Sequence, residues 1–245
     1  MNKKIIVTGG AGYIGSHTII ELIQNTDYEV ISFDNYSNSS EHTYGRIEQI
    51  TGKKIKHYNV DLCDLEETEK IFQKEENITG IIHFAAFKSV PESVENPYKY
   101  YHNNINSLLN LLELSLKFKV SNFIFSSSCS VYGNIDELPV SEETILNKAV
   151  SPYAFTKQIG EQIIKDYTKV NPELNVISLR YFNPVGAHKS ALIGEDPINP
   201  PTSLVPIITR TAIGKIREML VHGGDYETRD GSCIRDYVHV CDIAK

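Results

Sequence analysis

The feature that most constrains the fold of this sequence is a regular alternation of short apolar runs with helix-length amphipathic segments. Several runs, such as Phe123-Ile124-Phe125, lack polar alternation, which is typical of a strand covered on both faces. The apolar runs are residues 5–8, 30–34, 54–60, 80–84, 122–126 and 176–179, and the amphipathic segments are residues 14–24, 66–73, 98–118 and 153–170. We therefore predict an α/β fold with a doubly wound parallel sheet and right-handed crossovers.

The pattern changes after residue 182. Residues 183–206 are rich in Pro, Gly, Asn and Ser, as irregular loops are, and residues 204–215 have a helical pattern. We predict that residues 1–182 carry the sheet and that residues 183–245 form a small lobe, with an approximate boundary and chain crossing between the two parts. Such a lobe would lie over the carboxyl edge of the sheet, where ligands bind in this architecture.

Composition excludes several classes of function. A net charge of −7 argues against a nucleic-acid surface, which would be basic. No apolar stretch approaches the length of a membrane span, and the run after Lys3-Lys4 is too short for a signal peptide, so we expect a cytoplasmic protein. The four cysteines and eight histidines show no metal-ligand spacing, which predicts reduced thiols and no metal.

A glycine-rich turn follows the first apolar run. Gly9, Gly12 and Gly15 have the spacing G-x-x-G-x-x-G between a predicted strand and a predicted helix. Glycine lets the backbone approach a pyrophosphate, and the helix N-terminus offers free N–H groups to its charge. This pattern favours a dinucleotide site in a Rossmann fold over a merely tight turn. Asp34 ends the second run, where a carboxylate would bind ribose hydroxyls and repel a 2′-phosphate, which favours NAD over NADP; a turn cap is the alternative.

Tyr153 and Lys157 are four residues apart, so they share one face of a predicted helix. One such pair is expected by chance in this composition, and only the hydroxyls of the preceding strand, Ser128 and Ser130 among them, favour a catalytic role. A tyrosine base must have its pKa lowered from about 10 to near 7. A cation at about 4 Å has roughly that effect, so Lys157 and an oxidised nicotinamide ring could together suffice.

Three motifs together resemble those of the extended short-chain dehydrogenases, and among them the UDP-glucose (UDP-galactose) 4-epimerases. They are residues 8–17 (TGGAGYIGSH), Tyr153-x-x-x-Lys157 and residues 180–187 (RYFNPVGA), and the similarity extends to Lys245. The resemblance implies an isomerase of carbohydrate metabolism in which NAD stays bound and takes hydride from C4 of a UDP-hexose. Tyr153 would take the hydroxyl proton, and the 4-keto sugar would turn over before the hydride returns.

The resemblance also implies a role for individual positions. Tyr153 would be the base, Lys157 would tune it and hold the nicotinamide ribose, and Ser128 and Ser130 belong to the hydroxyl cluster. Cofactor positions are Gly9, Gly12, Tyr13, Ile14, Gly15, Asp34, Asn35, Asp61, Leu62, Phe84, Ala85, Ala86, Lys88, Asn103, Ser128, Tyr153, Lys157 and Phe182. UDP-sugar positions are Ser128, Tyr153, Asn183, Ser203, Leu204, Leu220, Val221, His222 and Arg235. Taken singly, each has a plain alternative, such as a loop cap at Asp61.

The sequence departs from the family in two places. Ser203 stands where asparagine is usual, so we expect a contact there to be shorter or lost. The family also continues well beyond the position of Lys245, so the resemblance predicts an incomplete sugar pocket.

Two other functions compete with epimerisation. The first is a related nucleotide-sugar dehydratase or decarboxylase; a dehydratase would need carboxylates beside the strand hydroxyls, and residues 128–132 contain none. A catalytically impaired NAD-binding protein is the other alternative. The family often pairs through its two long helices, here residues 98–118 and 153–170, which makes a homodimer possible.

Overall fold

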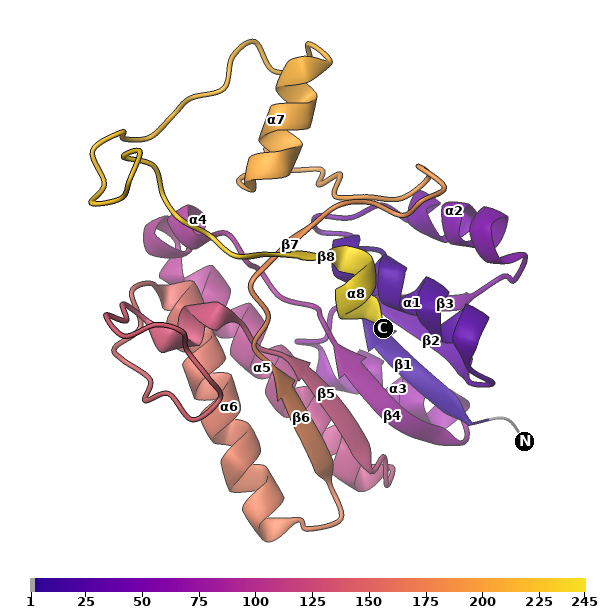
Figure 1. Ribbon diagram of the computed structural model, residues 1–245. Helices are drawn as coiled ribbons and strands as arrows, with labels where there is room; N and C mark the ends of the chain where they lie inside the picture. The colour runs from indigo at the N-terminus through magenta and orange to yellow at the C-terminus, as the bar shows by residue number, and fades with distance from the viewer. Residues whose placement is uncertain (1–2) are drawn as a thin grey trace.

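The computed structural model describes residues 3–245, and its centre is a parallel sheet of six strands (Figure 1). The strands are β1 (Lys4–Thr8), β2 (Glu29–Asp34), β3 (Lys56–Asn59), β4 (Ile78–His83), β5 (Asn122–Ser126) and β6 (Asn175–Leu179). Their order is β3-β2-β1-β4-β5-β6, and every neighbouring pair is parallel. The predicted doubly wound parallel sheet is thereby confirmed. The chain winds outward in one direction from β1 and then in the other from β4, which creates a switch point between them.

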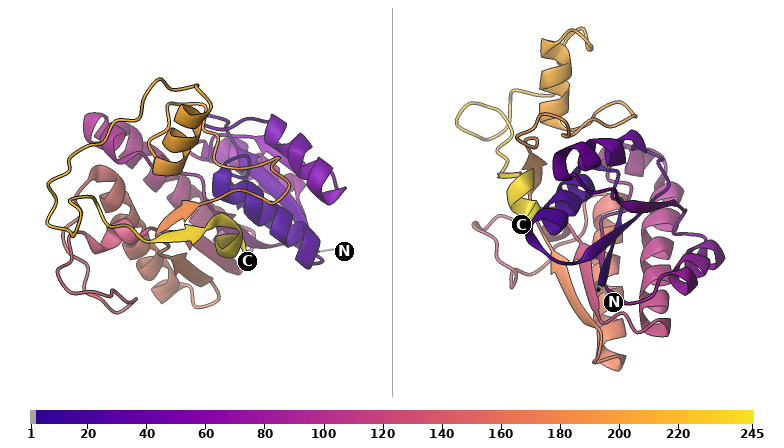
Figure 2. Two further views of the ribbon diagram at one scale, coloured as in Figure 1. Left: turned by 45° about the horizontal axis from the view of Figure 1, so that its top comes forward. Right: turned by 90° about the vertical axis from the view of Figure 1, so that its right-hand side faces the viewer.

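Helices cover both faces of the sheet (Figures 1 and 2). On one face, α3 (Leu65–Lys74), α5 (Pro97–Lys117) and α6 (Pro152–Val170) pack with the sheet in one core that includes Leu108, Leu111 and Phe123. On the other face, α1 (Tyr13–Asn25) and α2 (His42–Thr51) form a second core around Ile19 and Ile47. The second layer ends before the outer strands, and Ile177 on β6 is accordingly 60% exposed.

Proline and a polar cap fix the starts of the helices next to the site. Ser151 accepts a hydrogen bond from the Ala154 N–H (3.1 Å), and Pro152 opens α6. Asn96 accepts from the Lys99 N–H in the same way, and Pro97 opens α5. A capping side chain satisfies a free N–H, and proline has none to satisfy, so both helices begin at defined residues. This places Tyr153 in the first turn of α6.

The last part of the chain lies above the carboxyl ends of the strands, as orange and yellow segments in Figure 1. Short strands β7 (Asn183–Val185) and β8 (Tyr237–His239) pair in parallel, and α8 (Val240–Ala244) packs on α1. Helix α7 (Leu204–Ala212) stands away from the sheet with Leu204 and Ile208 exposed. It ends earlier than the predicted residue 215 because Gly214 has a left-handed φ of 74°, a common helix stop.

Several short elements escaped the sequence prediction. They are α2, α4 (Val90–Glu95), the 3₁₀ turn η1 (Cys129–Tyr132), β7, β8 and α8. Each is short or carries a mixed polar and apolar pattern, so its formation depends on packing against the rest of the fold.

Candidate functional site

The glycine turn joins β1 to α1 and lies against the segment that follows β4. Gly9 has a φ of 67°, and a Cβ there would lie 2.9 Å from the Ala85 nitrogen. A Cβ on Gly15 would lie 2.3 Å from the Gly9 carbonyl oxygen. Among the described residues no side chain caps α1 at Gly12, and its first turn holds no acidic residue. The turn is therefore tight, and its helix N-terminus suits a diphosphate, so the residues present fit the pyrophosphate of NAD.

Asp34 joins the end of β2 to this turn. One carboxylate oxygen accepts from the Ala11 N–H (3.0 Å), and the other accepts from the Tyr36 N–H (2.9 Å) and the Ser39 hydroxyl (2.8 Å). The adjacent Asn35 side chain accepts from the Ser37 N–H (3.1 Å). These contacts fix the Asp34 carboxylate at the carboxyl end of β2, beside the glycine turn, where a ribose hydroxyl would meet it.

The segment after β4 forms one wall of the site. The Thr8 hydroxyl contacts His83 (2.8 Å) and accepts from the Ala85 N–H (3.2 Å), which ties this wall to β1. Burial lowers the pKa of His83 to about 3, so its ring is neutral at pH 7. Asn104 on α5 pairs with both the N–H and the carbonyl of Phe87 (2.9 and 3.0 Å). Phe84, Ala85, Ala86 and Lys88 thus follow a backbone that is held from two sides.

The positions predicted for the adenine end lie after β3 and on α5. Asp61 accepts from the Cys63 N–H (2.9 Å), so it does cap a turn. Leu62 is buried, and Asn110 holds its carbonyl (2.8 Å). Asn103 donates to the neighbouring Asn104 side chain (3.0 Å). These residues therefore all take part in hydrogen bonds within the fold, and a contact with the cofactor would be an additional role.

The predicted catalytic residues meet at the carboxyl end of β5. The Ser128 hydroxyl accepts from the Ser130 N–H (3.2 Å), and its polar influence on Tyr153 acts to lower the pKa of that side chain. Lys157 Nζ donates to the Ser126 carbonyl (2.7 Å). The Ser130 hydroxyl is buried without a hydrogen-bond partner among the residues that the structure describes. Helix α6 contacts η1, the turn that follows β5, which explains how residues about 25 positions apart come together.

Lys157 lies near Tyr153 but binds a backbone carbonyl. Lys157 Nζ is 6.0 Å from the centre of the Tyr153 ring and donates to the Ser126 carbonyl. Burial raises the pKa of Tyr153, and the influence of Ser128 only partly opposes this. Burial also lowers the pKa of Lys157 to about 8. The expectation that Lys157 and an oxidised nicotinamide ring together lower the pKa of Tyr153 stays a prediction.

The positions predicted for the sugar nucleotide are spread over the lobe. Asn183 on β7 donates to the Asp236 carbonyl (2.8 Å), and Phe182 precedes it. Ser203 donates to Glu195 (2.9 Å), which also pairs with Lys88 (2.8 Å), so one half-buried carboxylate links the lobe to the wall after β4. This link gives Ser203 a partner that sequence reasoning did not foresee.

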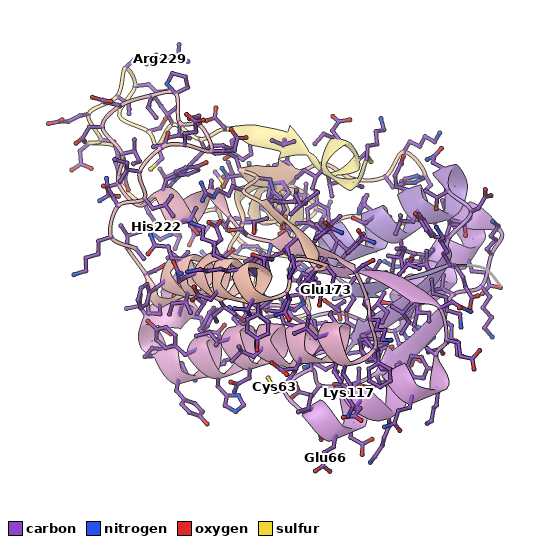
Figure 3. The ribbon with its side chains drawn as sticks, turned by 90° about the horizontal axis from the view of Figure 1, so that it is seen from below. Cys63, Glu66, Lys117, Glu173, His222 and Arg229 are labelled. Carbon is purple, nitrogen blue, oxygen red and sulfur yellow. The ribbon has the colours of Figure 1, made fainter. Side chains whose placement is uncertain are left out.

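The remaining predicted positions of the lobe are exposed. Leu204 lies at the start of α7, and Leu220 and Val221 are 69% and 76% exposed. His222 lies on the loop between α7 and β8, at the periphery of the molecule in Figure 3. Arg235 is also exposed, yet its charge acts on the Cys129 thiol, whose pKa is raised by burial and lowered by Arg235. Arg235 thus acts on a residue that lies between Ser128 and Ser130 in the sequence.

Sequence reasoning missed residues that support the site from behind. Glu161, Arg180 and Ser127 form a buried hydrogen-bonded group beside the catalytic positions. Glu161 follows Lys157 by four residues, as Lys157 follows Tyr153, and this spacing is the signal that could have identified it.

Comparison with known proteins identifies the family. Residues 5–245 match the model of the NAD dependent epimerase/dehydratase family. The chain belongs to this family. The UDP-glucose 4-epimerase of Caenorhabditis elegans is 48% identical, over 98% of this chain and 71% of the relative. That of Bacillus subtilis is 47% identical, over 98% of this chain and 70% of the relative.

Solved structures of the family agree with this assignment. A crystal structure of UDP-glucose 4-epimerase from Bifidobacterium longum in complex with NAD+ and UDP has a TM-score of 0.95 and 48% identity, and it covers 99% of this chain and 72% of that one. The Stenotrophomonas maltophila structure with bound NAD and formylated UDP-arabinopyranose has a TM-score of 0.93 and 42% identity, over 99% of this chain and 71% of that one. The predicted family resemblance is confirmed.

Two further properties concern the described residues. No helix among residues 3–245 is both long and apolar enough to cross a membrane. In the same residues no cluster of three or more His, Cys, Asp or Glu side chains is placed to hold a metal, and all four cysteines are unpaired.

Proposed function

We propose that this chain catalyses the NAD-dependent 4-epimerisation of a UDP-hexose, interconverting UDP-glucose and UDP-galactose. The observation that carries the proposal is the meeting of Ser128, Tyr153 and Lys157 at one sheet edge, the edge that also holds a glycine turn that fits a dinucleotide. The 4-epimerase relatives, at 46–49% identity, support this reaction over others on the same fold. Residues 128–132 also lack the carboxylates that a dehydratase would need.

Each part of the site has a distinct task in this reaction. NAD, when bound on the glycine turn and Asp34, supplies the hydride acceptor and a positive charge. Tyr153 takes the proton from the sugar 4-hydroxyl, and Ser128 orients that hydroxyl and relays the proton. The Lys157 ammonium group donates to the Ser126 carbonyl (2.7 Å), which holds it at the carboxyl end of β5. Because burial raises the pKa of Tyr153, the positive charge of the cofactor is needed for proton removal at neutral pH.

The lobe is the proposed site of the UDP group. Residues 183–245 form this substrate lobe and residues 1–182 the NAD domain. Asn183, Ser203, Leu204, Leu220, Val221, His222 and Arg235 are the proposed contacts, and the arginine suits a diphosphate because its fork of donors is always charged. A homodimer through α5 and α6 is also proposed, supported by exposed aromatic side chains there: Tyr98 is 74% and Phe155 is 45% exposed. A cytoplasmic location stays a prediction.

Turnover of UDP-galactose tests the proposed function. The purified chain should form UDP-glucose with no change of mass, and Tyr153→Phe should lower kcat by about 10³-fold while NAD stays bound, since a positioned base contributes roughly this much. Tyr28→Phe is the control, because Tyr28 lies in the loop before β2 and is 40% exposed. Activity surviving Tyr153→Phe contradicts the assignment of the base. A product lighter by one water indicates a dehydratase, and tight NAD without turnover favours the impaired protein.

A further inference from the structure

Three consecutive serines at the carboxyl end of β5, Ser126 to Ser128, lie against one face of α6. The Ser126 carbonyl accepts from Lys157 Nζ (2.7 Å), and the Ser127 hydroxyl donates to Glu161 (2.6 Å). Ser128 acts on Tyr153, whose pKa it helps to lower. Tyr153, Lys157 and Glu161 are spaced by four, so they lie in one row along α6. The two residues before Ser128 are therefore both hydrogen-bonded to the helix that carries Tyr153.

Ser127 contacts an ion pair that has no part in the proposed reaction, formed by buried Glu161 and half-buried Arg180. Glu161 is 5% exposed and Ser127 is 1% exposed. Arg180, the residue after β6, grips both Glu161 oxygens, with its Nε at 2.9 Å and an Nη at 2.6 Å. Its remaining nitrogen reaches the Glu142 carbonyl (3.2 Å). Burial opposes ionisation of Glu161, but Arg180 and Ser127 outweigh it and hold the pKa of Glu161 below its usual range.

We propose that Glu161 and Arg180 are positioning residues that set the place of Ser128 relative to Tyr153 by fixing Ser127. This inference rests on the proposed epimerase function of the site and assigns these residues a part in it. The Glu161 carboxylate on α6 accepts hydrogen bonds from Ser127, which follows β5, and from Arg180, which follows β6. It therefore links these three elements. A bidentate arginine–carboxylate pair holds direction as well as distance, which suits a positioning role.

The expected size of the effect follows from the neighbouring contacts. Ser127 and Ser128 are adjacent, so a shift of the Ser127 hydroxyl moves Ser128 with it. A misplacement of about 1 Å at a reacting group costs up to roughly 10²-fold in rate. Binding of the nucleotide, which involves other residues, should change little. A positioning role therefore predicts a loss in kcat with a nearly constant KM.

Two variants test the proposal at different strengths. Ser127→Ala removes one hydrogen bond and leaves the ion pair, and should lower kcat by about 10-fold. Glu161→Gln keeps the shape of the side chain but removes its charge, and should lower kcat by about 10²-fold, with KM within about 2-fold for both. Because both act through one contact, the double variant should be no slower than Glu161→Gln alone. Tyr167→Phe is the matched control: it removes a hydrogen bond to a carboxylate, Glu113, from the same helix, and kcat should stay unchanged.

A second measurement is independent of turnover. The ¹³Cζ signal of Tyr153 in the NAD-loaded protein, assigned with Tyr153→Phe, reports its pKa as pH is varied. The titratable groups facing Tyr153 are Lys157, Cys129 and Tyr181, and none is altered in these variants. Since Ser128 acts to lower the pKa of Tyr153, displacing Ser128 should raise that pKa in both variants, and Tyr167→Phe should not.

The two measurements separate this proposal from the proposed function. If the unaltered chain binds NAD but does not epimerise, the proposed function is wrong, and the Tyr153 titration still decides the positioning role. If Ser127→Ala and Glu161→Gln lower the melting temperature but leave kcat and the Tyr153 titration unchanged, the pair is merely structural and the proposal is overturned.

Discussion

Replacing Glu75 by glutamine should destabilise the protein in a pH-dependent way, because the Glu75 carboxylate binds side chains of both β1 and β3. Glu75 follows α3 and is 4% exposed. It accepts from Lys4 on β1 (2.8 Å) and from Lys56 and Tyr58 on β3 (both 2.5 Å). Burial opposes ionisation of Glu75, but these three donors outweigh it and lower its pKa from 4.5 to about 2.

The magnitude follows from the difference between the two pKa values of Glu75. A pKa that is about 2.5 lower in the folded state corresponds to about 3 kcal/mol at neutral pH. Lys56 is 53% exposed, so solvent screening reduces the expected value to about 2 kcal/mol. Because the folded pKa lies below the unfolded one, this stabilisation is complete above about pH 5 and is lost as pH falls toward 2.

Urea unfolding of the original chain and of Glu75→Gln over this pH range measures the effect. The variant should be less stable at pH 7 by about 2 kcal/mol, and the two unfolding free energies should converge as pH falls below about 4. Glu69→Gln is the control, since Glu69 pairs with Lys117 on the surface and its loss should change stability little. A difference that stays constant with pH would refute the argument, because it would then not come from ionisation of Glu75.

Two further substitutions test the frame of the cofactor site. Gly15→Ala should weaken NAD binding at least about 10-fold in a fluorescence titration, because its Cβ would lie 2.3 Å from the Gly9 carbonyl oxygen; Gly45→Ala, whose Cβ meets nothing within 4 Å, should bind normally. Equal affinities would show that the turn tolerates a side chain. Asn104→Ala should cost about 2 kcal/mol in chemical denaturation, since it strands the N–H and carbonyl of Phe87. A loss under about 0.5 kcal/mol would mean that water replaces Asn104.

The sequence predicted the fold because its strands and helices have clear local periods. Residues 122–126 were predicted as a strand with the bounds that β5 has, and the α/β class, the family and the NAD cofactor are confirmed. Element ends shifted where caps act, as at α7, whose last residue is Ala212. Helix α2 was missed because its helical pattern is weak, with Gly45 inside it and only Tyr44 and Ile47 buried.

The site was predictable in its local motifs and unpredictable in its pairings. The spacing of Gly9, Gly12 and Gly15 and that of Tyr153 and Lys157 are local, and the structure places both motifs at the predicted sheet edge. Their proposed roles in binding and catalysis remain predictions. The joint effect of Lys157 and the nicotinamide ring on the pKa of Tyr153 also stays a prediction, and burial acts against it by raising the pKa of Tyr153.

The sequence by itself determined the order of strands and helices, the glycine turn and the helical row that carries the base. The tertiary structure alone decided which partner each side chain takes. Lys157 donates to the Ser126 carbonyl, and Glu161 binds Ser127 and Arg180. Glu195 binds Ser203 and also Lys88, which precedes Glu195 by 107 residues. Local periodicity reports only which face of an element is buried, whereas these contacts depend on how separate elements pack, which no short stretch of sequence encodes.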